Sequence, residues 1–333
     1  MPQKKKLYYH VKKTTDLSSL PKIQGIDFSK KQTISSVIQS FATTGFQASE
    51  LAKAITIVQT MIREKASIYL SFTSNIISSG LRESVMHLTK TKKVHVLCTA
   101  AGGIEEDAIK AIDSFYLGSF TISGTSLFEE GVGRIGNIYA KNDEYAKLEL
   151  FMQKVFTSVY TTQQKTGRAV TPSQIAREIG RLLEVEKYNY TSSYLYWAYK
   201  NGIPVYCPGI IDGAIGDFAY YFKQKHPDFV IDVTQDHKAI IDYTLQQEKT
   251  GGIILGGGIS KHYVLNANIF KEGFDYTVYI STAQGFDGSD SGGNVEEAKS
   301  WAKIKIHTPS VKVFCDATIC FPLLVLESFE KKK

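Results

Sequence analysis

The sequence has few cysteines and no long apolar run, and each absence excludes a class of protein. Its 333 residues contain four cysteines, with no Cys-x-x-Cys pair, so the spacing typical of zinc and redox motifs is missing. No apolar stretch approaches the roughly 20 residues of a membrane span, and the start lacks the apolar stretch of a signal peptide. We expect a soluble, cytoplasmic protein without a metal site. We also expect buried, reduced thiols at all four cysteines, which are Cys98, Cys207, Cys315 and Cys320.

The body of the chain also lacks an excess of positive charge. The net charge is +6, but residues 4–6 and 331–333 are all lysines and supply six positive charges at the two ends. A nucleic-acid-binding protein concentrates Lys and Arg on one face or along one helix. The body of this sequence shows no such block, so we expect neither nucleic acid nor a membrane as a partner.

Six short β-rich runs recur along the chain, each followed by small residues and a helical pattern. This order predicts a parallel sheet with crossover helices. The runs are apolar on both faces, which is typical of strands covered by helices on each side. We therefore predict a doubly wound α/β fold with a mostly parallel, Rossmann-like sheet. The predicted strands are residues 67–72, 94–98, 203–207, 252–255, 276–280 and 311–315.

The first 65 residues show no strand of this kind. Residues 43–45, Thr-Thr-Gly, separate two stretches with apolar residues at helical spacing. We predict a helical N-terminal lead-in over residues 1–65, packed on an α/β domain over residues 66–330 that carries the functional site.

Small and polar residues follow several of the predicted strands, at residues 73–75, 99–103 and 256–258. Ligands bind at the carboxyl ends of strands in an open parallel sheet, and glycine lets the backbone approach a phosphate. Several such loops at one edge indicate a dinucleotide site. The Gly-x-Gly-x-x-Gly fingerprint is absent, because Lys261 stands where its last glycine would fall. Taken singly, each loop also fits an ordinary tight turn.

The densest polar stretch covers residues 282–303, directly after a predicted strand. Asn294 and Glu297 have the spacing of a helix cap, which is the simplest interpretation of Glu297. Glu297 and Trp301 are four residues apart and share one helix face. A carboxylate beside an indole suits an alkyl ammonium, which gains a charge pair and a cation–π contact. This stretch is therefore a candidate receptor for a polyamine.

Two nitrogen side chains near these loops are candidates for catalysis. Lys303 begins Lys-Ile-Lys-Ile-His, whose period of two predicts a strand with Lys303 and Lys305 on the same side. From spacing alone Lys303 is either a solvated surface charge or a nucleophile. His262 follows the triple glycine and is either a base or an ordinary hydrogen-bonded histidine. The local pattern leaves both alternatives open.

Six stretches resemble motifs of the deoxyhypusine synthase family, in the family's order, over about residues 20 to 330. The compact length and residues 194–200 resemble archaeal members more than animal ones. The resembling stretches are SNIISSG at 74–80, AGGIEED at 101–107, PGIIDGAIGD at 208–217, GGGISKH at 256–262, FDGSDSG at 286–292 and SWAK at 300–303.

The resemblance implies an NAD-dependent transfer of the aminobutyl group of spermidine. The acceptor is a lysine of the translation initiation factor 5A precursor, and the group passes through an enzyme-lysine imine. The resemblance also implies a homotetramer in which paired subunits share their active sites. The lysine-rich start does not resemble the short N-terminal plug of eukaryotic members.

The resemblance assigns roles position by position. Lys303 matches the covalent lysine, and His262 matches the histidine that accepts a proton during oxidation. Two positions depart from the family pattern: Ala100 replaces a threonine, and Tyr263 replaces a histidine. The positions that match spermidine contacts are Asp217, Asn266, Asp290, Glu297 and Trp301. The positions that match NAD contacts are Ser74, Ser78, Thr99, Gly102, Glu106, Asp212, Gly258, Asp287, Ser289, Asp316 and Ala317.

Three other functions are compatible with parts of the sequence. A homospermidine synthase gives the aminobutyl group to putrescine, and the sequence does not separate it from the first reading. A non-catalytic NAD or polyamine sensor would not need Lys303 and His262. An NAD-consuming protein deacylase has a similar sheet, but the acidic residues and the missing zinc-type cysteine pairs argue against it.

Overall fold

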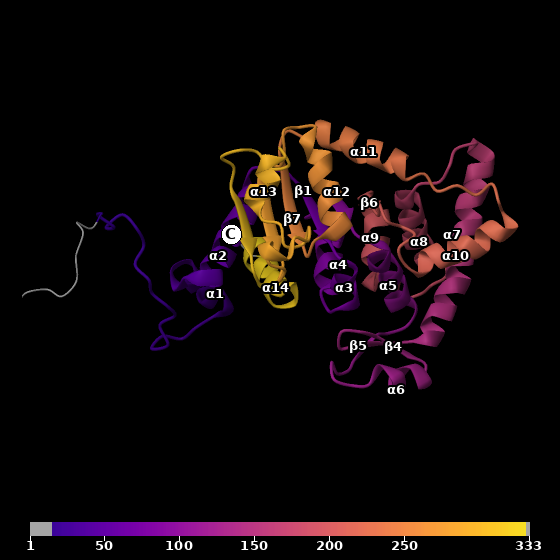
Figure 1. Cartoon of the computed structure of the whole chain (residues 1–333), viewed down its shortest axis with the longest axis horizontal. Coiled ribbons are helices and arrows are strands. Elements are labelled where there is room, and N and C mark those ends of the chain that lie inside the picture. The colour runs from indigo at the N-terminus through magenta and orange to yellow at the C-terminus, as the bar shows by residue number, and fades with distance from the viewer. Residues whose placement is uncertain (1–14, 331–333) are drawn as a thin grey trace, which may run out of the picture.

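The computed structural model describes residues 15–330, and a six-stranded parallel sheet forms its centre (Figure 1). The spatial order is β6-β2-β1-β7-β8-β9, and every neighbouring pair is parallel. Each of the six predicted runs contributes one strand, so the predicted parallel sheet is confirmed. The strands are β1 Ser67–Phe72, β2 Val96–Cys98, β6 Val205–Tyr206, β7 Thr250–Leu255, β8 Tyr276–Ile280 and β9 Ser310–Val313.

The chain builds this sheet outward from the middle in both directions. β1, β2 and β6 follow one another toward one edge, and β7, β8 and β9 follow one another toward the other. The direction therefore reverses between β1 and β7, and such a switch point leaves a crevice beyond the carboxyl ends of the two strands. Phe72 pairs with Leu255 at this end. The loops after β1 and β7 leave the sheet side by side, starting at Thr73 and Gly256. A Cβ added at Gly256 would lie 2.8 Å from Cγ2 of Thr73.

Side chains from the sheet enter two hydrophobic cores, one on each face. In β1, Tyr69 belongs to one core and Leu70 to the other. The core around Leu70 is covered by α2 Phe46–Arg63, α4 Arg82–Lys90, α5 Ala101–Ile112 and α14 Ala317–Ser328. The core around Tyr69 is covered by α11 Val233–Leu245 and α12 Gly258–Ile269. Burial on both faces explains why the strands are apolar throughout, and the doubly wound fold is confirmed.

Four further helices complete the body of the molecule. On the β6 side of the sheet lie α7 Asn142–Thr166, α8 Pro172–Val185, α9 Tyr194–Asn201 and α10 Ala214–Lys225 (Figure 1). Thr171 caps α8, and a proline occupies its first turn, where the missing N–H costs nothing. Among residues 15–330, no helix is both long and apolar enough to cross a membrane.

The described part of the region before β1, residues 15–66, contains two helices. α1 Ile34–Thr44 and α2 are separated by Gly45, whose φ of 95° ends α1. The predicted break at residues 43–45 is therefore confirmed. α2 packs closely against the sheet. Met61 of α2 lies over Gly251 of β7, where an added Cβ would be only 2.6 Å from the methionine sulfur. The lysine-rich start falls outside the described residues, and the division of the chain at residue 65 stays a prediction.

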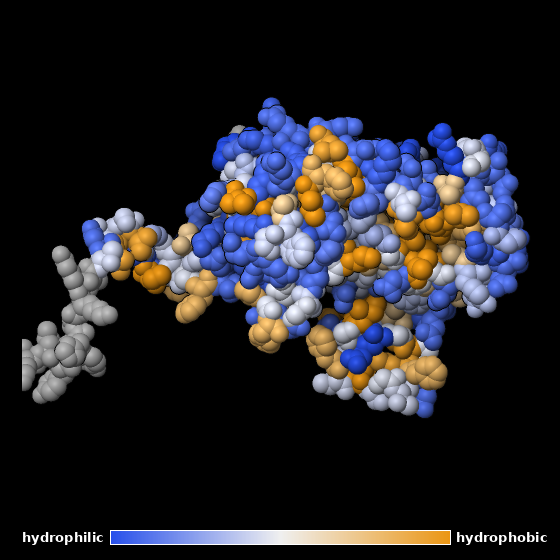
Figure 2. Space-filling model, turned by 45° about the horizontal axis from the view of Figure 1, so that its top comes forward, coloured by the Kyte–Doolittle hydropathy of each residue, from blue (hydrophilic) through white to orange (hydrophobic). Residues whose placement is uncertain are grey.

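A second, antiparallel sheet of three short strands forms a small lobe that the sequence did not predict. The lobe contains β3 Tyr116–Leu117, β4 Val132–Ile135, β5 Ile138–Lys141 and the helix α6 Gly124–Glu129. It projects at the bottom of Figure 2, where apolar side chains appear on its surface. Leu117 is 85% exposed and Phe128 is 80% exposed. These strands of two to four residues are too short and too exposed to produce a clear sequence pattern.

The cysteine prediction is confirmed at two positions and wrong at the other two. Cys98 and Cys207 are free and buried. Cys315 and Cys320 instead form a disulfide across the junction of β9 and α14. Their Cα atoms lie 6.5 Å apart because the first turn of α14 brings Cys320 back toward the end of the strand. This separation is within the usual range for a disulfide.

Candidate functional site

Three predicted residues meet beside α12 Gly258–Ile269. Nζ of Lys303 lies 3.1 Å from Nε2 of His262. Nδ2 of Asn266 lies 2.9 Å from Nδ1 of the same ring. His262 and Asn266 are one turn apart on α12, which starts directly after the glycine loop of β7, and Lys303 follows α13 Val295–Ser300. The three side chains form one continuous hydrogen-bonded chain.

The contacts of the His262 ring allow a proton to pass between this ring and Lys303. Nδ2 of Asn266 lies at hydrogen-bonding distance from Nδ1, and Nζ of Lys303 lies at hydrogen-bonding distance from Nε2. The tautomer of the ring sets the direction of each bond. The neutral amine is the nucleophilic form of lysine, and a neighbouring base can take up its proton. The geometry therefore suits covalent chemistry at Lys303.

The predicted strand around Lys303 is wrong. Ile304 makes only an isolated bridge with Phe274, and the flanking Ala302 and His307 have φ of 54° and 65°. These left-handed positions interrupt the extended backbone on both sides. Lys303 and Lys305 also have different partners, because Nζ of Lys305 lies 2.6 Å from Oδ1 of Asp275.

Three of the predicted polyamine-binding residues, Asp290, Glu297 and Trp301, lie on α13, at its C-cap or on the loop before it. Oδ1 of Asn294 accepts a hydrogen bond from the backbone N–H of Glu297 at 3.0 Å, so the predicted cap of α13 is confirmed. Glu297 is exposed, and Trp301 at the end of this helix is 67% exposed. Oδ2 of Asp290 is buried and has no hydrogen-bond partner among the described residues. A buried carboxylate oxygen without a partner is costly, and a cationic ligand would relieve that cost.

Several predicted cofactor contacts lie beyond β1 and β2. The Thr99 hydroxyl is fully buried and lacks a hydrogen-bond partner among the described residues. A Cβ at position 102 would lie 2.7 Å from Oγ of Ser74, so only Gly102 fits there. Ser78 of α3 Ser74–Ser78 donates to the buried Glu106. Burial raises the pKa of Glu106 to about 8, so this carboxyl is mostly protonated at neutral pH.

The remaining predicted cofactor contacts lie beyond β7, β8 and β9. Oδ1 of Asp287 accepts hydrogen bonds from N and Oγ of Ser289, at 2.8 and 2.6 Å, and the Ser289 hydroxyl lowers the pKa of Asp287. Asp316 caps α14 by accepting from the Thr318 amide at 2.8 Å, and Ala317 is the first residue of that helix. Gly258 has a φ of 67°, which favours glycine. All these residues face the predicted edge of the sheet.

Glu105 is a residue of this region that sequence reasoning missed. It is buried, and its carboxylate accepts a hydrogen bond from the Ile215 amide at 3.0 Å. Glu105 thereby holds the start of α10, next to Asp212 and Asp217. Its position within the resembling stretch 101–107 is the sequence feature that points to this residue.

Asp212 and Asp217 are the predicted residues that the single chain does not bring to Lys303. They follow β6 at one edge of the sheet, whereas Lys303 precedes β9 at the other. No hydrogen bond or ion pair links either aspartate to Lys303 among residues 15–330.

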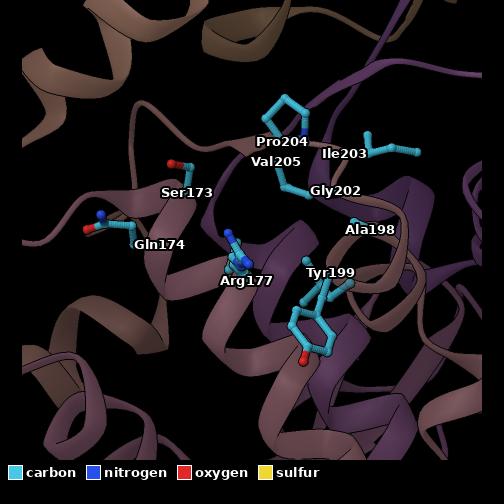
Figure 3. A pocket seen from close by; sticks show the side chains of 11 residues that line it. Ser173, Gln174, Arg177, Ala198, Tyr199, Gly202, Ile203, Pro204 and Val205 are labelled. Atoms are coloured by element: carbon cyan, nitrogen blue, oxygen red, sulfur yellow. The ribbon is translucent and has the colours of Figure 1, made fainter. Parts of the chain in front are cut away.

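The well-defined cavities lie apart from Lys303. Two adjoining cavities of about 190 and 430 Å³ lie beside α8 and α9 and share Gln174, Arg177 and Tyr199. Figure 3 shows the smaller one, where Arg177 and Tyr199 lie close to each other. A third cavity of about 530 Å³ reaches Ser78 and the small lobe. Only Ser78 of the predicted site residues lines any of the three. No cluster that could hold a metal ion occurs among the described residues.

The doubly wound sheet and the Lys303–His262 contact define an α/β enzyme equipped for covalent group transfer. A family model described as deoxyhypusine synthase matches residues 36–328, and the chain belongs to this family. It is therefore an aminobutyl transferase, and the family implies a polyamine and a protein as substrates.

Individual relatives agree with this assignment. The chain is 43% identical over 338 residues to a deoxyhypusine synthase of Senecio vernalis, covering 94% of this chain and 90% of the relative. It is also 43% identical to a homospermidine synthase of Senecio vulgaris, with the same coverage. A crystal structure of a protein from Entamoeba histolytica assigned as a deoxyhypusine synthase is similar, with a TM-score of 0.64 and 28% identity. That match covers 93% of this chain and 98% of the other.

Proposed function

We propose that the chain transfers the aminobutyl group of spermidine, with NAD as cofactor, to a lysine of the translation initiation factor 5A precursor. The observation that carries this proposal is the 3.1 Å contact between Lys303 and His262, backed by Asn266. A transfer through an enzyme-lysine imine needs a lysine that can present a lone pair and a neighbouring group that exchanges its proton. Lys303 and His262 meet both requirements.

The residues beyond β1 and β2 fit NAD. The buried Thr99 hydroxyl has an unused hydrogen-bonding capacity, and Gly102 permits close approach to Ser74. NAD, when bound, supplies the hydride acceptor for polyamine oxidation and the hydride donor for the final reduction. The residues that would hold it are Ser74, Ser78, Thr99, Gly102, Glu106, Asp212, Gly258, Asp287, Ser289, Asp316 and Ala317.

The chain's own residues account for the transfer steps. Nζ of Lys303 attacks the oxidised carbon of spermidine, the bond from that carbon to the departing amine breaks, and 1,3-diaminopropane leaves. The aminobutyl group is then joined to Lys303 as an imine. Nε2 of His262 lies close enough to take up and return the proton that Lys303 exchanges. A lysine of the protein substrate next attacks the same carbon and releases Lys303.

The acidic residues position the polyamine in this proposal. Oδ2 of Asp290 is buried and accepts no hydrogen bond among the described residues, with the Lys261 ammonium 4.0 Å away. Glu297 lies on α13, and the exposed Trp301 is the C-cap of that helix. A carboxylate binds an ammonium group by a charge-assisted hydrogen bond, and an indole face adds a cation–π contact. Asn266 and Asp217 complete the proposed set of spermidine contacts.

We also propose a cytoplasmic homotetramer in which paired subunits share their sites. This arrangement would allow Asp217 of one subunit to approach Lys303 of another, a contact that the single chain lacks. Mixing Asp217→Asn subunits with Lys303→Arg subunits tests it, because mixed pairs hold one intact site. We expect transfer activity to return after subunit exchange, together with a tetramer mass by light scattering. A monomer, or no recovery from an exchanged mixture, would contradict the shared site.

A homospermidine synthase is the second candidate, because relatives with that name are as similar as the deoxyhypusine synthases. The deciding experiment incubates the protein and NAD with labelled spermidine and either the factor precursor or putrescine. We expect label on the precursor lysine and little labelled homospermidine. Label only in homospermidine would establish the second candidate. Binding of NAD without transfer to either acceptor would instead support a non-catalytic sensor.

A further inference from the structure

Two buried lysines outside the predicted site hold the loop of residues 283–293. Lys261 on α12 is 4% exposed and Lys312 on β9 is 7% exposed. Lysine side chains are rarely buried at this level without an ion-pair partner in direct contact. Here the closest carboxylate oxygen to Lys261 is Oδ2 of Asp290, at 4.0 Å. Both ammonium groups instead make their hydrogen bonds to the backbone of one loop.

The side chain of Lys312 makes all of its hydrogen bonds to this loop. Its Nζ donates to the carbonyl oxygens of Ala283, Ser291 and Gly292, at 3.0, 3.3 and 2.5 Å. An ammonium group has three N–H donors, and these three carbonyls match that number. Lys312 thus ties the start of the loop to its end.

Lys261 holds the same loop from the other side. Its Nζ donates to the carbonyl oxygens of Asp290 and Gly293, the latter at 3.2 Å. The ammonium also lies 4.8 Å from the centre of the Tyr279 ring. Because Lys261 precedes His262 on α12, this contact links the helix that carries the proposed base to the loop.

The loop also has internal hydrogen bonds, such as those from Ser289 to Asp287, but it buries little apolar surface. Its apolar side chain Phe286 is 91% exposed, so burial of apolar surface contributes little. Burial of the two lysines lowers the pKa of each, which shows that their charge has lost hydration. Carbonyl dipoles that face the ammonium groups offset that loss. Hence the loop backbone and the two lysines stabilise each other.

We propose that Lys261 and Lys312 are positioning residues for the transfer reaction. They form a clamp that holds residues 283–293 in the conformation that presents Asp287, Ser289 and Asp290 to the cofactor and the polyamine. The effect on catalysis rests on the proposed function of those three residues. The clamp itself rests on the hydrogen bonds of the two lysines.

Methionine replaces either lysine with a similar apolar stem and without the N–H donors. In Lys312→Met and Lys261→Met we expect hydrogen exchange of the amides in 283–293 to rise on the order of tenfold or more, while the central strands stay protected. KM for NAD and spermidine should rise by a similar factor, with kcat at saturation changed less. Lys305→Met is the matched control, because Lys305 binds Asp275 and does not touch the loop. The control should leave loop exchange unchanged.

Lys312→Gln retains two amide N–H donors without the charge, and it should give loop exchange and KM values between wild type and Lys312→Met. It also keeps the test decisive if Lys312→Met fails to fold. Unchanged loop exchange in folded Lys261→Met and Lys312→Gln, or equal opening in Lys305→Met, would overturn the clamp.

Carboxylate variants separate the clamp from the proposed function. If Asp287→Asn and Asp290→Asn leave both ligands' binding intact while Lys312→Met opens the loop, the clamp stands and the assignment of the loop residues fails. If the carboxylate variants weaken binding and the lysine variants neither open the loop nor raise KM, the assignment stands and the clamp is wrong.

Discussion

Nζ of Lys303 and Nε2 of His262 are separated by 41 residues in the chain and by 3.1 Å in the structure. The glycine loop after β7 starts the helix that carries His262, and the short helix α13 delivers Lys303 from the neighbouring crossover. Two adjacent crossovers of one parallel sheet therefore place the proposed nucleophile and the proposed proton acceptor in contact.

Lys303→Arg should abolish transfer, because a guanidinium stays protonated and cannot act as an amine nucleophile. Lys303 is not one of the proposed NAD contacts, so NAD binding should be unchanged. In the wild type, borohydride treatment with NAD and labelled spermidine should place the label on the peptide that contains Lys303. Label on Lys261 or Lys305, or full transfer by the arginine variant, would refute the assignment of the nucleophile.

Asp290→Asn and Glu297→Gln should weaken spermidine binding much more than NAD binding. Each substitution removes one charged acceptor, and a hydrogen bond to a charged group contributes about 1.5 to 3 kcal/mol. Calorimetry with each ligand on the same preparation measures the difference. Equal losses for both ligands would count against the division of the site into polyamine and cofactor parts.

Trp301→Ala should weaken spermidine binding by about 0.5 to 2 kcal/mol through the lost cation–π contact. The side chain is 67% exposed in the single chain, so the substitution removes little packing within it. We expect Tm to change little. A large fall in Tm with intact spermidine affinity would instead assign Trp301 a purely structural role.

Glu106 should make stability depend on pH. Burial raises the pKa of this carboxyl from 4.5 to about 8, so between these values the folded state binds more protons than the unfolded state. Stability should therefore fall as pH rises from about 4.5 to about 8 and level off above that. Glu106→Gln should remove this part of the slope and raise Tm most at high pH. Urea unfolding of both proteins at several pH values measures the effect, and parallel pH profiles would contradict it.

The Cys315–Cys320 disulfide should stabilise the fold under oxidising conditions. Closing so short a loop contributes about 2 kcal/mol in the chain-entropy model. Cys320→Ser should lose stability of this order without reductant and match the wild type when both proteins are reduced. Thiol titration of the unfolded, unreduced wild type should find two free thiols. Four free thiols would show that the bridge does not form.

Much of the sheet could be predicted from the sequence, because a strand buried on both faces appears as a continuous apolar run. Residues 67–72 and 276–280 are apolar runs with the length of a strand, and both form strands as expected. Gly45 similarly marks a helix boundary through its own backbone conformation. The short strands of the small lobe show no such pattern, since exposed residues such as Leu117 do not alternate with buried ones.

The sequence by itself determined the six strands of the central sheet, the cap of α13 and the order of the resembling motifs, because each depends on neighbouring residues. Only the tertiary structure decided which side chains meet across the sheet. Lys305 follows Lys303 by two residues, yet one binds Asp275 and the other His262, because left-handed residues turn the backbone between β8 and β9. The contacts of Lys312 with a loop about twenty residues earlier likewise could not be predicted from the sequence. Contacts of this kind form between distant segments, and no local spacing encodes them.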